Sequence, residues 1–332
     1  MATYYGTYGQ KVQYLASDPS DPQIGQVWYN STSAVLKVRQ ETTVNAWSSG
    51  GNLNTARSQN SAIGTQTAAI NAGGNIISPS PGPVTASESY DGTSWTTTSS
   101  LPTAQAWAAG FGTQTSAIYA GGTQSPGTAT ASWNGSSWTA LPATMNTARY
   151  GLGGVGIQTA GLIMGGETSG FKVATESWNG SAWTSVNNMN TARYALAAAG
   201  TQSGCWAASG GTATPPYYTN ATELWNGTSW TNNPTGLNTT RATGGNAGSQ
   251  TAGLAFGGES SPGAAAVTAT ELWNGSTWTS NPTGLATARK EFTGCGTQAA
   301  ALAIGGNTQS NRLSATEEWN TILASNKTVT VS

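Results

Sequence analysis

The chain has 332 residues, and its 12 basic and 13 acidic side chains leave a formal net charge of −1. Charged residues make up 8% of the sequence, against roughly 25% in an ordinary soluble domain. We therefore expect no binding to nucleic acid or to an anionic membrane surface. Because no apolar run reaches the about 18 residues that a membrane span needs, we also expect no membrane insertion.

The absence of histidine and the presence of only two cysteines exclude further kinds of catalytic and metal site. There is no histidine, which removes the commonest general base and metal ligand. We therefore expect no metal, no cofactor and no catalytic centre. The two cysteines, Cys205 and Cys295, cannot build a disulfide framework and are expected to be small buried apolar residues. The N-terminus lacks a basic region followed by an apolar core, so no Sec-type signal is expected.

Residues 1–42 form an N-terminal segment that does not share the pattern of the later chain. Residues 18–22 are rich in turn-forming types. Two alternating stretches, 25–30 and 34–38, flank a Ser-Thr-Ser turn and predict a β-hairpin. The residues GQVWYNSTSAVLKV resemble a segment of tail-fibre and other virion proteins of bacteriophages. The resemblance implies an attachment module, and the alternative is an accessory hairpin that covers the next domain.

A repeat fills the chain from residue 47 to residue 320, as six units of about 43–48 residues. Each unit has Thr-Ala-Arg or a variant, then Gly-Thr-Gln or a variant, then a diglycine, then an aromatic residue. In five units this aromatic is followed by Asn-Gly or Asp-Gly, two residues and a tryptophan. These five copies span residues 90–95, 133–138, 178–183, 225–230 and 273–278.

Each unit predicts four short strands and no helix. In the third unit the strands begin in residues 150–156, continue in 161–164 and 174–178, and end around Trp183. Asn-Gly predicts a tight hairpin with a type I′ turn, in which both central residues have positive φ. The repeated tryptophans are expected to pack between neighbouring sheets, because large aromatic side chains dominate buried area.

The order of arginine, apolar strand, diglycine and two aromatics resembles the kelch repeat. The resemblance implies an all-β, six-bladed β-propeller with four-stranded blades over residues 43–320. The last unit has Trp319 but no second tryptophan, whereas Trp47 stands alone ahead of the first unit. We therefore expect residues around 44–48 to supply the fourth strand of the last blade and close the ring. Residues 321–332 remain as a C-terminal tail that can add a strand.

Arginine and glutamate vary together among the units. Glutamate stands two residues before the first aromatic in every unit except the second, which has Gln105 at the arginine site and Ala131 at the glutamate site. Losing one member of a buried ion pair costs about 3–5 kcal/mol, whereas losing both can be nearly neutral. The joint loss predicts structural ion pairs, which are Arg57–Glu88, Arg149–Glu176, Arg193–Glu223, Arg241–Glu271 and Arg289–Glu317.

The loop between the second and third strands varies most, with 11 to 16 positions from diglycine to aromatic. Variable loops on a rigid scaffold commonly carry binding. The candidate ligand contacts on this loop face are Ile76, Phe171, Lys172, Tyr217 and Tyr218. The alternative is that these side chains cap the disc or pack on a neighbouring subunit.

These features predict a non-enzymatic structural protein of a bacteriophage virion: a tail fibre, an appendage or a head (capsid) decoration, in multiple copies per particle. The N-terminal segment would contact other virion proteins, and the loop face would contact a host-surface glycan or protein. The alternatives are a bacterial kelch-type protein-interaction adaptor and a surface glycan-binding protein. A glycosidase would have to pair non-repeat glutamates such as Glu167, Glu259 or Glu291, and the sequence gives no reason to pair them.

Overall fold

The computed structural model describes residues 12–78, 80–309 and 311–329, without the side chains of 41–44 and 322–327. Within this part of the chain every regular element is a β-strand. No described segment is a helix with the length and apolarity to cross a bilayer. The chain divides into two compact units, one of residues 46–319 and one that combines residues 1–45 with 320–332.

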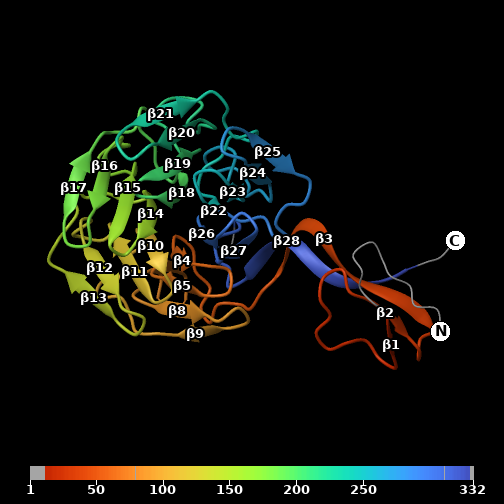
Figure 1. Cartoon of the computed structure of the whole chain (residues 1–332). Helices are drawn as coiled ribbons and strands as arrows, with labels where there is room; N and C mark the ends of the chain where they lie inside the picture. Colours follow the sequence, from red (N-terminus) through yellow and green to blue (C-terminus); the bar gives the residue numbers. More distant parts are fainter. Residues whose placement is uncertain (1–11, 79, 310, 330–332) are drawn as a thin grey trace. The chain divides into compact units, whose positions relative to one another are not determined.

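The larger unit is built from repeated antiparallel sheets, which Figure 1 shows following one another around a common centre. Among the described residues, five sheets have four strands each, in chain order. They are β4–β5–β8–β9 (Ser61–Gly64, Ala69–Ala72, Ser87–Tyr90, Trp95–Thr97), β10–β13 (Ala109–Thr113, Ser116–Ala120, Thr130–Trp133, Trp138–Leu141), β14–β17 (Gly153–Ile157, Ala160–Met164, Thr175–Trp178, Trp183–Val186), β18–β21 (Ala197–Thr201, Gly204–Ala208, Thr222–Trp225, Trp230–Asn233) and β22–β25 (Gly245–Gly248, Gly253–Phe256, Thr270–Trp273, Trp278–Asn281). A short pair, β6 (Asn75–Ile76) and β7 (Gly82–Pro83), lies in the first variable loop. This repetition is consistent with the blades of a β-propeller.

The last sheet combines the two ends of the repeat. It contains β26 (Thr293–Gly296), β27 (Ala300–Ile304), β28 (Thr316–Thr328) and then β3 (Val35–Ser49). The ring centroids of Trp47 and Trp319 lie 5.5 Å apart. Strand β3 therefore occupies the fourth-strand position that the isolated Trp47 predicts.

Side chains of the repeat join each sheet to the preceding one. The glutamine of Gly-Thr-Gln donates its amide to the carbonyl of the preceding sheet's first aromatic, as from Gln158 to Trp133 at 2.6 Å. The same bond joins the first sheet to the last, because Gln66 donates to the carbonyl of Trp319 at 2.7 Å. The other members are Gln114–Tyr90, Gln202–Trp178, Gln250–Trp225 and Gln298–Trp273.

The second tryptophan of the repeat makes a further bond between sheets, from its indole N–H to a threonine hydroxyl. The pairs are Trp47–Thr270, Trp95–Thr316, Trp183–Thr130, Trp230–Thr175 and Trp278–Thr222. The exception is Trp138, where the first sheet offers Ser87. Both the Trp138 N–H and the Ser87 hydroxyl are buried without a partner among the described residues.

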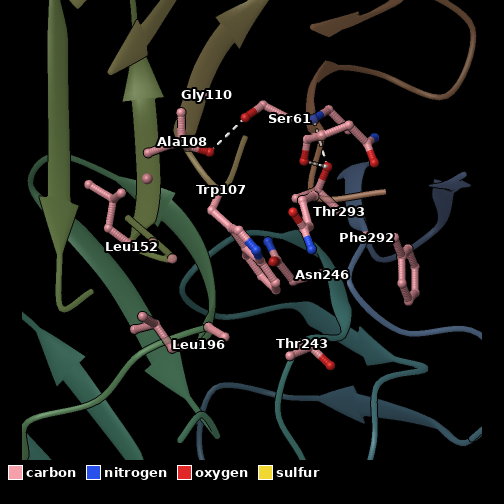
Figure 2. Close-up of a pocket in the computed structure, with 18 of the residues that line it drawn as sticks. Ser61, Trp107, Ala108, Gly110, Leu152, Leu196, Thr243, Asn246, Phe292 and Thr293 are labelled. Carbon is pink, nitrogen blue, oxygen red and sulfur yellow. Dashed lines mark hydrogen bonds between the residues drawn. The ribbon is translucent and has the colours of Figure 1, made fainter. Parts of the chain in front are cut away.

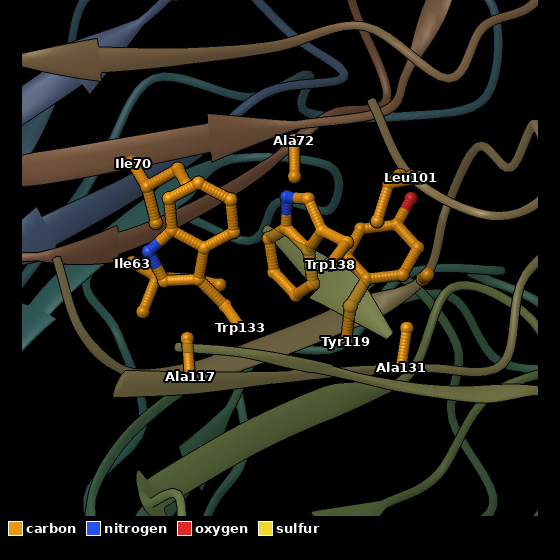
Figure 3. Packing of buried hydrophobic residues seen from close by; sticks show 10 residues of the cluster. Ile63, Ile70, Ala72, Leu101, Ala117, Tyr119, Ala131, Trp133 and Trp138 are labelled. Carbon is orange, nitrogen blue, oxygen red and sulfur yellow. The ribbon is translucent and has the colours of Figure 1, made fainter. Parts of the chain in front are cut away.

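The core lies between consecutive sheets. Figure 3 shows Trp133 and Trp138 of the second sheet with Ile63 and Ile70 of the first sheet in one buried cluster. The two indole centroids are 5.2 Å apart. The repeated aromatics therefore fill the space between sheets, as their spacing predicts.

The Asn-Gly hairpins form, but the predicted turn type is wrong. The paired aromatics, such as Trp133 and Trp138, enclose a loop of four residues, in which Gly135 has a φ of 94° and Asn134 has no positive φ. The Asn134 side-chain oxygen accepts the backbone N–H groups of Ser136 and Ser137. An Asx turn thus replaces the two-residue type I′ turn, because the asparagine bonds its own loop and needs no left-handed backbone.

The smaller unit contains the predicted N-terminal hairpin. Strand β2 (Val27–Asn30) pairs antiparallel with residues 35–38 of β3, and β1 (Gln13–Leu15) pairs parallel with β2. Asp18 holds the hairpin by accepting bonds from Trp28, Asn30 and Lys37. The hydrogen bond from Lys37, followed by the other two, lowers the pKa of Asp18 to about 2. Strand β28 continues into the C-terminal tail as far as Thr328.

Candidate functional site

The five arginine–glutamate pairs lie inside the sheets. Arg149 Nη2 is 2.8 Å from Glu176 Oε1, and both side chains are buried. Arg149 Nη1 also donates to the carbonyls of Gly165 and Ala174, and the other four arginines repeat this arrangement. The second glutamate oxygen accepts a backbone N–H from the turn before the arginine, here that of Asn146. These ion pairs connect separate segments of the same sheet, so their role is structural.

The second sheet replaces the ion pair with an uncharged arrangement. Gln105 is buried, and its side chain donates to the carbonyl of Gln124 and accepts the Gln124 backbone N–H. No charge is left alone at this site, because Ala131 takes the place of the glutamate. The joint loss in the sequence predicts the ion pairs of the other sheets, but nothing in the sequence indicates the role of Gln124.

The five candidate loop residues do not form one exposed surface. Ile76 and Tyr218 are buried, which corrects their assignment as ligand contacts, because neither offers an accessible side chain. The Tyr218 hydroxyl donates instead to Glu259. Tyr217 is 50% exposed, whereas Phe171 and Lys172 are half-buried.

A ring of six backbone hydrogen bonds surrounds the centre of the larger unit. Its members stand two positions after the arginine site of each unit, and each N–H donates to the carbonyl of its counterpart in the preceding unit at 2.6–3.0 Å. The N–H of Gln59 donates to the carbonyl of Glu291, so the cycle returns to its start. The six members are Gln59, Trp107, Gly151, Ala195, Thr243 and Glu291.

All six ring members have left-handed backbone, with φ between 52° and 62°. This conformation costs roughly 1–2 kcal/mol for a residue with a Cβ, yet five of the six are not glycine. The cost is met in five of the six units, so the strain belongs to the architecture. The side chains at these positions differ from unit to unit, unlike those of the sheets, so the repeat does not fix their identity.

A cavity of about 110 Å³ lies inside this ring, lined by residues from all six units of the repeat. Figure 2 shows the indole of Trp107 extending into it. The lining is partly polar and includes Asn60, Thr243 and Asn246. The Asn60 Oδ1 and Thr243 Oγ1 atoms are buried without a hydrogen-bond partner among the described residues.

Aromatic rings gather beside Trp107. The ring centroid of Tyr194 lies 5.8 Å from that of Trp107, 6.2 Å from that of Tyr150 and 5.4 Å from that of Phe171, on which it stacks. All four side chains are half-buried. Burial, followed by the nearby carboxylates, raises the pKa of Tyr194, so its hydroxyl stays protonated at neutral pH. We call Trp107, Tyr150, Phe171 and Tyr194 the aromatic cluster.

Three non-repeat glutamates act electrostatically on Tyr194, although they come from separate units. Glu259 is buried and paired with Lys290. Glu291 is 3.2 Å from Arg312 and also accepts a bond from Gln59. Glu167 accepts the hydroxyl of Tyr150, and burial and this bond raise the tyrosine pKa. Two of the three carboxylates are thus already neutralised.

The arrangement suits non-covalent recognition. Half-buried aromatic faces stand beside a small cavity whose lining is partly apolar and partly polar, and small-molecule binding sites combine these two kinds of group. No group of three or more cysteine, aspartate and glutamate side chains able to hold a metal occurs in the described ranges. Trp107 and Tyr194 are not among the residues that the sequence predicts for the site. The signal for them is that the position two after the arginine site differs in every unit, and the position one after it varies as well, while the surrounding motif repeats.

The sequence matches no known protein-family model, and no curated protein is significantly similar to it.

Proposed function

We propose that the protein is a non-enzymatic structural protein of a bacteriophage virion, a fibre, appendage or head decoration that displays a kelch-like propeller. The observation that carries this proposal is the N-terminal unit. The segment GQVWYNSTSAVLKV, which resembles segments of phage virion proteins, forms a hairpin held by Asp18, and its second strand continues as strand β3 of the last sheet. A module of this kind can bind a particle without using the repeated sheets.

We further propose that residues 46–319 are a closed propeller of six blades. The cyclic backbone hydrogen bonds support closure, because the bond from Gln59 to Glu291 is equivalent to the five others. The bond from Gln66 to Trp319 supports it independently. Closure protects the sheet edges, which suits a protein exposed on a particle surface.

A non-enzymatic role is supported by the state of the carboxylates around the cavity. A general base needs a carboxylate that is free to accept a proton from a substrate. Glu259 and Glu291 are each paired with a cation, and Glu259 is buried. The aromatic cluster favours a second candidate function, that of a surface glycan-binding protein that is not part of a particle.

Mass spectrometry of purified phage particles tests the proposal. We expect the chain in the particles, and we expect Asp18→Ala to lower its incorporation because the hairpin loses its central acceptor. The matched control is Asp21→Ala, which changes an exposed aspartate of the same segment. A chain that is made in the infected cell but missing from particles would refute the virion role and favour the second candidate. Equal incorporation of both variants would refute attachment through the hairpin.

A further inference from the structure

We propose that the cavity and the aromatic cluster form a binding site for a neutral glycan, with a sugar ring lying against Trp107 and Tyr194. This inference rests on the proposed function for its biological role, which is recognition of a host surface. Its chemistry rests on the described residues alone. It places the binding site at the centre of the repeated sheets, whereas the sequence predicts it at the loop tips.

Trp107 differs from the other tryptophans of the chain. Of the 14 tryptophans, all but Trp107 and Trp138 donate their indole N–H to a described partner. Trp138 is buried in the core, whereas Trp107 is half-buried and extends into the cavity. Its N–H is therefore a free donor at the site.

The scaffold does not require an aromatic ring at this position. The equivalent residues of the next two units are Gly151 and Ala195, with the same left-handed backbone and the same hydrogen bonds around the ring. The Trp107 ring packs on Tyr194 on one side, and the part of it that stays exposed is apolar surface in water, which is unfavourable. A bound ligand would cover that exposed part.

Unpartnered polar atoms give a second, independent indication. Thr243 and Asn60 belong to the cavity lining, and each has a buried side-chain oxygen without a partner among the described residues. Buried polar groups are nearly always satisfied, by protein, ligand or water. A ligand whose hydroxyl groups reach these side chains would satisfy both oxygens.

The balance of charge and shape favours a sugar. Glu259 and Glu291 are paired with cations, and Glu167 is the one of the three carboxylates without a salt bridge among the described residues, so the site has little net charge with which to select an ion. A pyranose ring combines an apolar face, which suits an aromatic side chain, with a rim of hydroxyls that donate and accept hydrogen bonds. The aromatic cluster beside a polar cavity offers both kinds of contact.

An array of defined oligosaccharides, probed with the purified full-length protein, tests the inference. The array contains neutral hexose, N-acetylhexosamine, amino-sugar and sialic or uronic acid glycans. We expect binding to at least one neutral or N-acetylated glycan. Binding to none of these, or only to amino or acidic sugars, would overturn the proposal, and amino sugars alone would indicate a cation–π site instead.

Two variants assign the site. Trp107→Ala and Tyr194→Ala install residues that the chain already has at equivalent positions, Ala195 and Ala242. We expect each to weaken binding at least tenfold and Tyr194→Ala also to lower the Tm, because its ring packs against three others, whereas Trp107→Phe, which keeps an aromatic face but loses the N–H, should retain part of the affinity. The matched control is Tyr217→Ala, an exposed aromatic outside the cluster. Undiminished binding by both alanine variants would overturn the assignment. Because this assay needs no particle, its failure and a failure of the virion role are distinguishable.

Discussion

Removing one member of a buried ion pair should cost far more than removing both. Arg149→Gln leaves the buried Glu176 carboxylate with the Asn146 backbone N–H as its remaining described partner, and Glu176→Ala leaves a buried guanidinium. Each single change is expected to destabilise the protein by about 3–5 kcal/mol. The double variant recreates the glutamine and alanine that the second sheet uses, so its cost should be well below the sum of the two singles.

Equilibrium urea denaturation of the wild type, both single variants and the double variant forms a double-mutant cycle. For the double variant to cost less than either single variant, the coupling energy has to exceed the cost of one single change, so we expect at least about 3 kcal/mol, the upper end of the range seen for residues in direct contact. The matched control is a second double-mutant cycle with Lys37→Gln and Asp18→Asn. This ion pair is partly exposed, so its coupling energy should be far smaller. Additive losses at Arg149 and Glu176, or single losses below about 1 kcal/mol, would refute the account of why the second unit lost both residues.

Three further changes test other contacts. Ser87→Thr should raise the free energy of unfolding by about 1 kcal/mol, because the other units give the second tryptophan a threonine partner and Trp138 lacks one. Urea denaturation measures the change, and an unchanged midpoint of unfolding would contradict this prediction. Thr243→Gly should stabilise by up to about 1 kcal/mol by releasing left-handed strain in the ring, and a loss of stability would show that its packing outweighs the strain. Asp18 has a pKa of about 2 in the folded chain against 3.8 ordinarily. The stability that its carboxylate gives the hairpin should therefore be complete above about pH 4 and be lost as the pH falls through about 2. The indole N–H resonance of Trp28, recorded by NMR across this range, measures the loss, and the same pH dependence in Asp18→Asn would refute the assignment.

The repeat itself made much of the fold predictable. A contact that recurs in every unit leaves a recurring pair of residues in the sequence, so the ion pair of Arg149 and Glu176 could be inferred from its absence in one unit. The place of Trp47 beside Trp319 could be inferred in the same way, from a strand signature missing at one end and surplus at the other. Both inferences depend only on comparing the units with one another.

Features that occur within a single unit were harder to predict from the sequence. The Asn134 turn was misassigned because Asn-Gly is shared by two kinds of loop, and only the register of Trp133 with Trp138 shows that four residues intervene. Ile76 and Tyr218 were expected at loop tips because long loops are generally exposed. In the fold, Ile76 belongs to the short pair β6–β7, and Tyr218 lies under its loop against Glu259.

The aromatic cluster could not be read from sequence spacing, because Trp107 and Tyr194 lie 87 positions apart by number and meet only where units converge. The ring of backbone hydrogen bonds explains why such a site can exist there. Since the backbone of each unit supplies the bond and bears the strain, the repeat does not prescribe the side chain at that position, which can differ between units. Gln59, Gly151 and Glu291 stand on the same backbone as Trp107 with unrelated chemistry. A scaffold whose sheets repeat therefore brings unlike side chains together around one cavity, and that is where a specific ligand can be distinguished from its relatives.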